Sequence, residues 1–335
     1  MQKNTFIVHY KLYIKFIMSF MNLRLANIMA VFLAVLFFSN TAFCFDQEEF
    51  IIDHLYYKSI NLPKEKRPKI ILVLGGGGAR GFAHIGVLKA LREANVPVDM
   101  VVGTSMGALV GSLYCSGIKI EDLENIAEDI KWGDISNLGV TSLITMVTSE
   151  KLLSTEKMEK YINKMIGDKY FFQLNIPFAC VATDIKTGEK IIFKEGPVAP
   201  AARASATIPG IFAPVPYRQR FLVDGGLVEN IPVSVAKLFE PDIIITVAVR
   251  ADITKNSYNN IFTTLFQTIY IQGQQSDIDN LKISDVVISP QVSDVSAIEL
   301  NKAVECIDAG FIAGKRSLKR IKKLIIDKTY EKNVL

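Results

Sequence analysis

The chain has 335 residues and half of them are apolar, which is enough for one large hydrophobic core or two smaller ones. Its 38 basic and 34 acidic residues leave a net charge of +4, which does not favour nucleic acid as a partner but is compatible with an anionic membrane surface. The four cysteines form no CxxC pair and no metal-ligand spacing, so no metal site is predicted. If Cys44 is removed with a signal peptide, three cysteines remain, which argues against a disulfide framework.

The N-terminal residues predict export. An unbroken apolar run at 28–38 follows basic residues, and Ala42 and Cys44 supply small residues at cleavage spacing. This run is shorter than the roughly 20 residues that a membrane-spanning helix needs. We therefore expect residues 1–44 to be a signal peptide, with an uncleaved membrane anchor as the alternative. The protein would then be exported, as a periplasmic, envelope-associated or secreted protein. The polar residues 45–68 are expected to form an N-terminal arm.

Two strand–loop–helix patterns follow each other in the next stretch. An apolar β-type run at 70–74 stops at the four glycines 75–78, and residues with helical periodicity follow at 83–91. A second β-type run at 100–102 meets the turn GTSMG at 103–107, which precedes another helix-type run. Ligands of open parallel sheets bind beyond the carboxyl ends of the strands. Both turns are therefore expected at one site.

Strand-type and helix-type segments continue to alternate, which predicts an α/β fold with a mostly parallel sheet and helices on both faces. The apolar segment 137–148 is expected either to be buried or to act as a lid near the site. Residues 69–250 would form the catalytic core, and 251–335 a helical C-terminal portion packed on it. The later strands are predicted at 178–183, 190–193, 221–223, 242–249 and 286–289, and the later helices at 121–130, 154–166, 261–281 and 298–324.

Ser105 is the expected nucleophile. It stands in the pattern Gly103-x-Ser105-x-Gly107, which is the spacing of a nucleophile elbow. The turn from strand to helix is so tight that its flanking residues must be small, and this places the serine hydroxyl at the tip. The spacing alone recurs by chance, but here it lies between a predicted strand and a predicted helix.

The histidines are in the wrong places for the usual serine–histidine pair. His9, His54 and His84 all precede Ser105, whereas α/β-hydrolases place the histidine after the serine and the acid. This order argues strongly against the α/β-hydrolase fold. His84 lies in the helix after the glycine loop and is expected to have a structural role near the elbow.

A carboxylate can replace histidine as the base if it lies within hydrogen-bonding reach of the hydroxyl. Asp224 is the best candidate, because it ends a short apolar strand and precedes Gly225 and Gly226, which allow the backbone to turn. Asp184 and Asp99 are weaker candidates for the same role. Asp184 is expected to be a turn residue.

The glycine loop at 75–78 is expected to bind an anion. It supplies successive unhindered amides at the start of a helix, which suits the oxyanion of an ester hydrolysis. Arg80 adds positive charge, either in support of this oxyanion hole or toward a lipid phosphate.

The same loop also matches a dinucleotide-binding pattern, Gly76-x-Gly78-x-x-Gly81. That reading needs an acid at the end of the next strand, but Asp99 precedes that strand and Ser105 follows it. A nucleotide-binding domain is therefore only a distant alternative.

Four segments together resemble the patatin-like phospholipase family, in particular its bacterial members. They are GGGGARGFAHIGVLKAL at 75–91, GTSMGALVGSLYCSG at 103–117, RASATIPGIFAPV at 203–215 and LVDGGLVENIPVSVA at 222–236. The resemblance implies a three-layer α/β/α fold with a mostly parallel central sheet, and a Ser105–Asp224 dyad. The other positions that it implies are an oxyanion hole at Gly76, Gly77 and Gly78 with Arg80 beside it, and the motif glycines Gly81, Gly103, Gly107, Gly225 and Gly226.

The resemblance also implies an activity. Members of the family are lipid acyl hydrolases that need no metal, and no cofactor is expected here. We expect a serine hydrolase that cleaves carboxylic ester bonds of phospholipids or lysophospholipids at a membrane surface, through an acyl-enzyme. The alternative is a membrane-binding, effector-like module whose esterase activity is weak or needs a host activator. The sequence indicates neither the head group, nor the acyl position, nor the oligomeric state.

Overall fold

The computed structural model describes residues 47–136, 152–250 and 261–334. The chain divides into two units, Met1–Leu55 and Tyr56–Leu335. The predicted signal peptide and the predicted lid segment at 137–148 lie outside the described residues and stay predictions. Helix α3 (Gln47–Ile60) occupies much of the stretch expected to be an arm. No helix in the described ranges is both long and apolar enough to cross a membrane.

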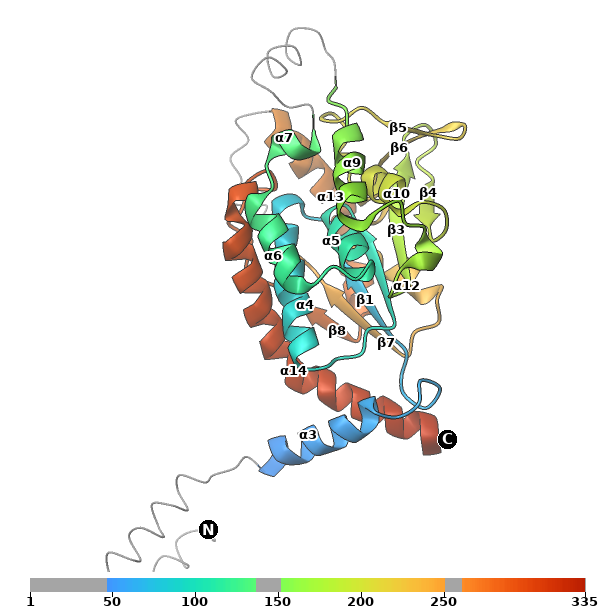
Figure 1. Cartoon of the computed structure of the whole chain (residues 1–335), viewed down its shortest axis with the longest axis vertical. Coiled ribbons are helices and arrows are strands. Elements are labelled where there is room, and N and C mark those ends of the chain that lie inside the picture. The colour runs from blue at the N-terminus through green and yellow to red at the C-terminus, as the bar shows by residue number, and fades with distance from the viewer. Residues whose placement is uncertain (1–46, 137–151, 251–260, 335) are drawn as a thin grey trace, which may run out of the picture. The chain divides into compact units, whose positions relative to one another are not determined.

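The second unit is built on an eight-stranded sheet with the order β5-β6-β3-β2-β1-β7-β8, in which β4 also pairs with β3 (Figure 1). Strands β8, β7, β1, β2 and β3 run parallel, and β4, β5 and β6 are antiparallel to their neighbours. The predicted mostly parallel sheet is thus confirmed. The strands are β1 (Ile70–Leu74), β2 (Met100–Thr104), β3 (Phe178–Asp184), β4 (Lys190–Phe193), β5 (Val215–Tyr217), β6 (Arg220–Asp224), β7 (Ile243–Val247) and β8 (Val286–Ile288).

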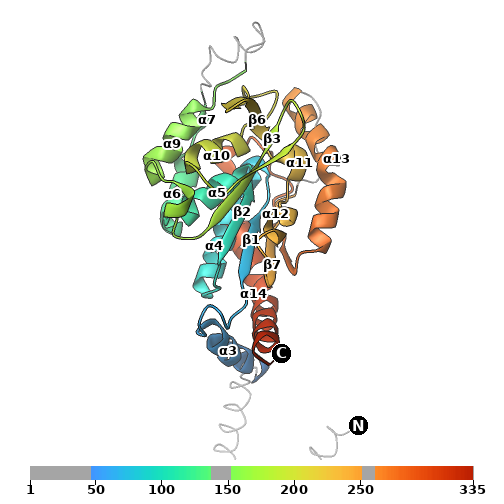
Figure 2. The same ribbon diagram turned by 90° about the vertical axis from the view of Figure 1, so that its right-hand side faces the viewer.

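Helices cover both faces of the sheet, which confirms the predicted three layers (Figure 2). Successive residues of a strand point to opposite faces of the sheet, so they belong to two separate hydrophobic clusters, one on each face. Leu72 packs toward α4, α5 and α14, whereas Val73 packs toward α12 on the other face. The remaining helical elements are η1 (Gly78–Phe82), α4 (Ala83–Glu93), α5 (Met106–Cys115), α6 (Ile120–Asp129), α7 (Trp132–Ile135), α9 (Glu156–Ile166), η2 (Phe171–Gln173), α10 (Val198–Ser205), α11 (Gly226–Glu229), α12 (Val233–Lys237), α13 (Ile261–Lys282), η3 (Leu300–Lys302) and α14 (Ala303–Val334).

Several elements differ from the sequence-based expectations, and the short helices α7, α10, α11 and α12 are not among the predicted ones. The final helix is predicted over 298–324, but residues 300–302 form a 3₁₀ turn and α14 continues to Val334. Strand β5 is not predicted at all, because it has only three residues and contains Pro216, which suits an edge strand and leaves no readable alternation.

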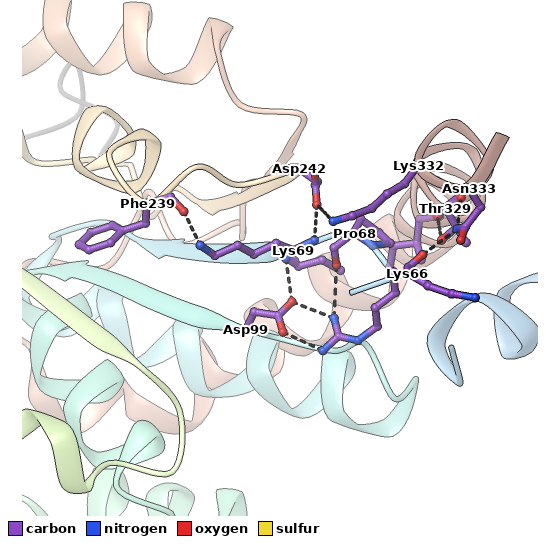
Figure 3. A network of polar contacts seen from close by, with 12 residues as sticks. Lys66, Pro68, Lys69, Asp99, Phe239, Asp242, Thr329, Lys332 and Asn333 are labelled. Atoms are coloured by element: carbon purple, nitrogen blue, oxygen red, sulfur yellow. Dashed lines mark hydrogen bonds and ion pairs between the residues drawn. The ribbon is translucent and has the colours of Figure 1, made fainter. Parts of the chain in front are cut away.

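Asp99 belongs to the amino end of the sheet, opposite the elbow. The guanidinium of Arg67 donates two hydrogen bonds to the Asp99 carboxylate, at 2.8 and 2.7 Å. The backbone N–H of Ile70 donates a third, at 2.9 Å (Figure 3). Asp99 directly precedes β2, whereas Ser105 follows the other end of that strand. Asp99 therefore anchors the entry of β1 and does not reach the serine.

The C-terminal end of α14 is hydrogen-bonded to residues at the same amino end of the central strands. The carboxylate of Asp242 accepts hydrogen bonds from the backbone N–H of Lys69 at 2.7 Å and from Lys332 at 2.8 Å (Figure 3). The side-chain amide of Asn333 donates to the carbonyl of Lys66 at 2.7 Å. The last turn of the C-terminal helix is thus hydrogen-bonded to the segment that leads into β1, in keeping with the expected packing of the helical C-terminal portion on the core.

Helices α14 and α4 approach so closely that their backbones touch. A Cβ atom on Gly86 would lie 1.9 Å from the carbonyl oxygen of Ile307, and one on Gly310 would lie 2.0 Å from that of Ala83. Both obstacles are backbone atoms, which cannot turn aside. The contact therefore requires glycine at both positions.

Replacing Gly310 by alanine is expected to destabilise the protein by about 2 kcal/mol. The forced separation of two packed helices exceeds the roughly 1 kcal/mol that alanine gains over glycine in a helix. Urea unfolding at constant pH measures the change. Arg316→Ala, on the exposed side of the same helix, is the matched control and should change stability by no more than about 0.5 kcal/mol. Equal stability of Gly310→Ala and the wild type would contradict the close packing.

Candidate active site

Ser105 sits on a strained turn between β2 and α5. Its backbone has φ 55° and ψ −123°, a conformation that costs a non-glycine residue roughly 1–3 kcal/mol. A Cβ atom on Gly103 would lie 2.5 Å from the carbonyl oxygen of Gly107, and one on Gly107 would lie 2.1 Å from that of Leu74. Only glycine therefore fits on either side of the serine, as the elbow spacing predicts.

The strand pairing brings Asp224 to this turn. Thr104 pairs with Val181 across β2 and β3, and Asp224 pairs with Ala182 across β3 and β6. The serine and the aspartate thus follow strands that flank β3 on either side, about 10 Å apart at the level of the backbone. Their side chains must turn toward each other over the end of the sheet. This turn requires glycine at position 225, because a Cβ atom there would lie 2.2 Å from the carbonyl oxygen of Val181.

Ser105 and Asp224 are directly hydrogen-bonded. The Ser105 hydroxyl donates to Oδ2 of Asp224 at 2.5 Å, and the Gly226 backbone N–H donates to Oδ1 at 2.8 Å. Both residues are buried. Burial raises the pKa of Asp224 to about 6, against the opposing effect of these two hydrogen bonds. The carboxyl is therefore ionised at neutral pH, but it binds a proton more readily than an exposed aspartate, which suits a general base.

Ser205 supports the nucleophile and was not predicted from the sequence. Its hydroxyl accepts a hydrogen bond from the Ser105 backbone N–H at 3.0 Å and donates to the Val181 carbonyl at 2.6 Å. It is the last residue of α10 and lies in the third of the four resembling segments, at 203–215. Its place in that segment was the only indication that Ser205 belongs to the site, because nothing near it in the sequence indicates a contact with a residue one hundred positions away.

The glycine loop contributes two of its three expected amides. Gly77 and Gly78 line the pocket beside Ser105. Among the described residues, no hydrogen bond uses the backbone N–H of either glycine. The N–H of Gly76 instead donates to the Asn230 carbonyl at 2.9 Å. The expectation that Gly76 is an oxyanion donor is therefore corrected, because its only donor is already in use.

Arg80 does not reach the pocket. Of the two roles expected for it, support of the oxyanion loop or contact with a lipid phosphate, the structure favours the first, because the side chain is buried and its Nη1 donates to the Val295 carbonyl at 3.0 Å. It is not among the described residues that line the pocket. The neighbouring Ala79 N–H donates to the Ala297 carbonyl at 2.8 Å, so this part of the chain holds the glycine loop in place.

His84 has the structural role expected of it. Its Nε2 lies 2.8 Å from the carbonyl oxygen of Gly75 and donates to it, which fixes the start of the glycine loop. Burial lowers the pKa of His84 to about 4, so the ring is neutral at physiological pH. Asp184 is a turn residue, as expected: it accepts from the Lys186 backbone N–H at 3.0 Å and pairs with Arg220 at 3.0 Å.

The pocket at this site encloses about 500 Å³, counting its open mouth. Besides the dyad, it brings in Asp277 from α13, a residue for which the sequence holds no signal. Among the described lining residues, the only ionisable side chains other than the serine are Asp224 and Asp277, and both are acidic. The described parts of the chain hold no group of three or more histidine, cysteine or acidic side chains placed to bind a metal ion.

The chain is similar to known proteins over its central part. A model of the family described as patatin-like phospholipase matches residues 72–237. An uncharacterised NTE family protein of Mycobacterium tuberculosis is 35% identical over 183 residues, which are 55% of this chain and 49% of that protein. The lysophospholipase nte1 of Emericella nidulans is 28% identical over 277 residues, which are 75% of this chain and 18% of that protein. The chain thus spans half or less of the length of these relatives. Among solved structures, human GIVD cytosolic phospholipase A2 superposes with a TM-score of 0.48 at 11% identity, covering 86% of this chain and 65% of that one.

Proposed function

Because the chain belongs to the patatin-like phospholipase family through residues 72–237, we propose that it is a serine hydrolase that cleaves carboxylic ester bonds of phospholipids or lysophospholipids. The observation that carries the proposal is the 2.5 Å hydrogen bond between the Ser105 hydroxyl and the buried carboxylate of Asp224. A serine held this way has a base in contact and faces a pocket. The name lysophospholipase, which belongs to a relative, is consistent with this class of substrate.

The dyad would work in two half-reactions. The Ser105 hydroxyl attacks the ester carbonyl carbon while Asp224 accepts its proton, which forms a tetrahedral intermediate with a negatively charged oxygen. Collapse of the intermediate breaks the bond to the alcohol, which leaves with the proton from Asp224, and the acyl group remains on the serine. A water molecule, deprotonated by Asp224, then attacks the acyl-enzyme. The fatty acid is released and the hydroxyl of Ser105 is restored.

The negative oxygen of both intermediates needs hydrogen-bond donors. The amides of Gly77 and Gly78 are in position to supply them, because both residues line the pocket with Ser105 and neither amide is used elsewhere among the described residues. Each such donor typically contributes roughly 3 kcal/mol to transition-state stabilisation. The roles of Gly76, Arg80 and His84 would be to hold these two amides in place.

Two measurements test the proposal. The purified protein should release fatty acid from phospholipids labelled separately at each acyl chain, and the label that appears identifies the ester that is cleaved. A fluorophosphonate should react with it at a single serine. Fatty-acid release without a fluorophosphonate adduct would exclude a serine nucleophile. Absence of both activities in the purified protein would favour the alternative, a membrane-binding module with weak or host-activated esterase activity.

The rate should depend on pH through the base. Because Asp224 must be ionised to accept a proton and its pKa is raised to about 6, kcat/KM for a soluble p-nitrophenyl ester should rise tenfold per pH unit below 6 and level off above 7. His84 titrates near pH 4 and lies outside this window. A rate that stays constant between pH 5 and pH 8 would contradict Asp224 as the base.

A further inference from the structure

A second cavity lies among the helices that cover one face of the sheet, next to the turn that carries Ser105. Its walls come from α5, from α6 and α9, which both contact α5, and from η1 (Figure 1). It encloses about 580 Å³, counting its open mouth, against about 500 Å³ for the dyad pocket, which is the pocket that Ser105 and Asp224 line. The two cavities share no described lining residue, and no step of the proposed reaction uses the second one.

The walls are apolar because three helices turn their hydrophobic stripes toward the same space. The stripe of α5 has the spacing i, i+3, i+4 and i+7 of one helix face. Its residues are Met106, Leu109, Val110 and Leu113. Helices α6 and α9 present stripes of the same kind, which include Ala127 and Met158. Apart from Tyr161, every described lining side chain is a hydrocarbon or a thioether.

These stripes leave a void between them, unlike those of an ordinary core contact. The centre of a water molecule could occupy about 60 Å³ of the void, whereas one bound water needs roughly 10–15 Å³. Folded cores hold few voids larger than a water molecule. A water here would find too few of the polar partners that a buried water needs, so the space suits a hydrocarbon.

The cavity begins at the two elements that hold the reacting groups. Met106 directly follows Ser105, and Phe82 ends the 3₁₀ turn that begins at Gly78. Both side chains line the cavity. A Cβ atom on Gly81 would lie 2.4 Å from Cγ of Met106. The motif glycine at position 81 thus makes room for Met106 at the end of the cavity nearest the nucleophile.

We propose that this cavity binds the hydrocarbon chain of the acyl group whose carbonyl carbon lies at Ser105, and that its depth sets the preferred chain length. The inference rests on the proposed function, since it concerns the substrate of the same site. The carbonyl carbon must lie between the Ser105 hydroxyl and the amides of Gly77 and Gly78, so the chain leaves it beside the turn and the loop that run into this cavity. Met106 and Met158 are unbranched and flexible, so they can move aside for a chain longer than the void.

The dyad pocket is a poorer place for the chain. Its described lining includes the polar side chains of Asp224, Asn230 and Asp277. A hydrocarbon packed against them would remove polar groups from water without a hydrogen bond in exchange, which is costly. The apolar cavity carries no such cost, since it holds almost no polar group to desolvate.

The test compares p-nitrophenyl butyrate with p-nitrophenyl octanoate, which differ by four methylene groups, both below the concentration at which they form micelles. Each methylene moved from water into an apolar cavity improves binding about three- to fourfold. We therefore expect kcat/KM for the octanoate to exceed that for the butyrate by about 30-fold or more. The ratio is measured within each variant, so that any general loss of activity cancels.

Two variants change the volume of the cavity in opposite directions. Ala127→Leu fills part of the space, so the octanoate-to-butyrate ratio should fall about tenfold. Leu113→Ala lengthens the cavity about two turns along α5 from Ser105 and should raise the ratio of decanoate to octanoate about threefold. Asn125→Leu is the matched control, because it adds the same side chain on the exposed side of α6, and it should change neither ratio.

Three results would overturn the proposal. One is a wild type with an octanoate-to-butyrate ratio near 1. Another is a folded Ala127→Leu protein with the wild-type ratio, whether both activities persist or both fall equally. The third is an unchanged decanoate-to-octanoate ratio in Leu113→Ala, which decides the matter if Ala127→Leu does not fold. Failure of the proposed function itself is distinguishable: the wild type would then cleave neither ester and would not react with a fluorophosphonate.

Discussion

Ser105→Ala is expected to lower kcat/KM for ester hydrolysis by about 10⁴-fold or more, because it removes the atom that would carry the acyl group in the proposed mechanism. The backbone should keep its conformation, since alanine is no more strained than serine at φ 55°. Intact mass after fluorophosphonate treatment should show one adduct on the wild type and none on the variant.

The matched control for this variant is Ser112→Ala on the same helix. The Ser112 hydroxyl is buried and donates to the Leu109 carbonyl at 2.8 Å, far along α5 from the pocket, so its removal should leave turnover within about twofold and the adduct in place. An adduct on the Ser105→Ala protein, or turnover close to that of the wild type with an intact fold, would exclude Ser105 as the nucleophile.

Asp224→Asn should lower kcat by about 10³- to 10⁴-fold, because an amide cannot accept the proton of Ser105. The same change should stabilise the fold at alkaline pH. The pKa of Asp224 is about 6 in the folded protein and near 3.9 in an unfolded chain, so the folded state holds the proton more tightly. The contribution of this carboxyl to stability is present below pH 4 and is lost as the pH rises through 6.

At pH 8 the asparagine variant should therefore be more stable than the wild type by about 2–3 kcal/mol, and at pH 4 the two should be equal. Urea unfolding at both pH values measures the difference. Asp184→Asn is the control with the opposite sign, because hydrogen bonds from the Lys186 backbone and Arg220 lower the pKa of that carboxyl, so its neutralisation should destabilise the fold at neutral pH and leave catalysis intact. Wild-type turnover in Asp224→Asn would refute the dyad.

The two variants together separate catalysis from folding. Among the described residues, Asp224 receives hydrogen bonds from Ser105 and from the Gly226 backbone only, so its buried charge lowers the stability of the fold. The proposed role as a base would account for its presence. The strained backbone conformation of Ser105 likewise lowers the stability of the fold. Activity and stability are expected to oppose each other at both residues.

Local features of the site could be predicted from the sequence because they are imposed by neighbouring residues. The requirement for Gly103 and Gly107 around Ser105 follows from a tight turn between a strand and a helix, and all three residues lie within five positions of one another. The parallel core strands could likewise be predicted from continuous apolar runs, since burial on both faces leaves no polar alternation. Asp224 was favoured by its place at the end of a short strand and by the family resemblance.

Long-range hydrogen bonds explain the predictions that were wrong. Gly76 was expected to donate to the oxyanion, and contact with a lipid phosphate was one of the two roles expected of Arg80. Their partners, the carbonyls of Asn230 and Val295, come from segments more than 150 residues later, and no local pattern indicates that they approach the glycine loop. Ser205 was missed for the same reason, since its contact to Ser105 depends on the packing of α10 against the elbow.

The sequence by itself determined which residue types stand at the turns: a serine between glycines, a glycine-rich loop before a helix, and an aspartate before two glycines. Only the tertiary structure decided which of these groups meet. The order of β2, β3 and β6 brings Ser105 within 2.5 Å of Asp224, and the packing of α13 brings Asp277 into the same pocket. The physical reason is that strand pairing and helix packing join positions more than one hundred residues apart, and periodicity along the chain carries no information about those distances.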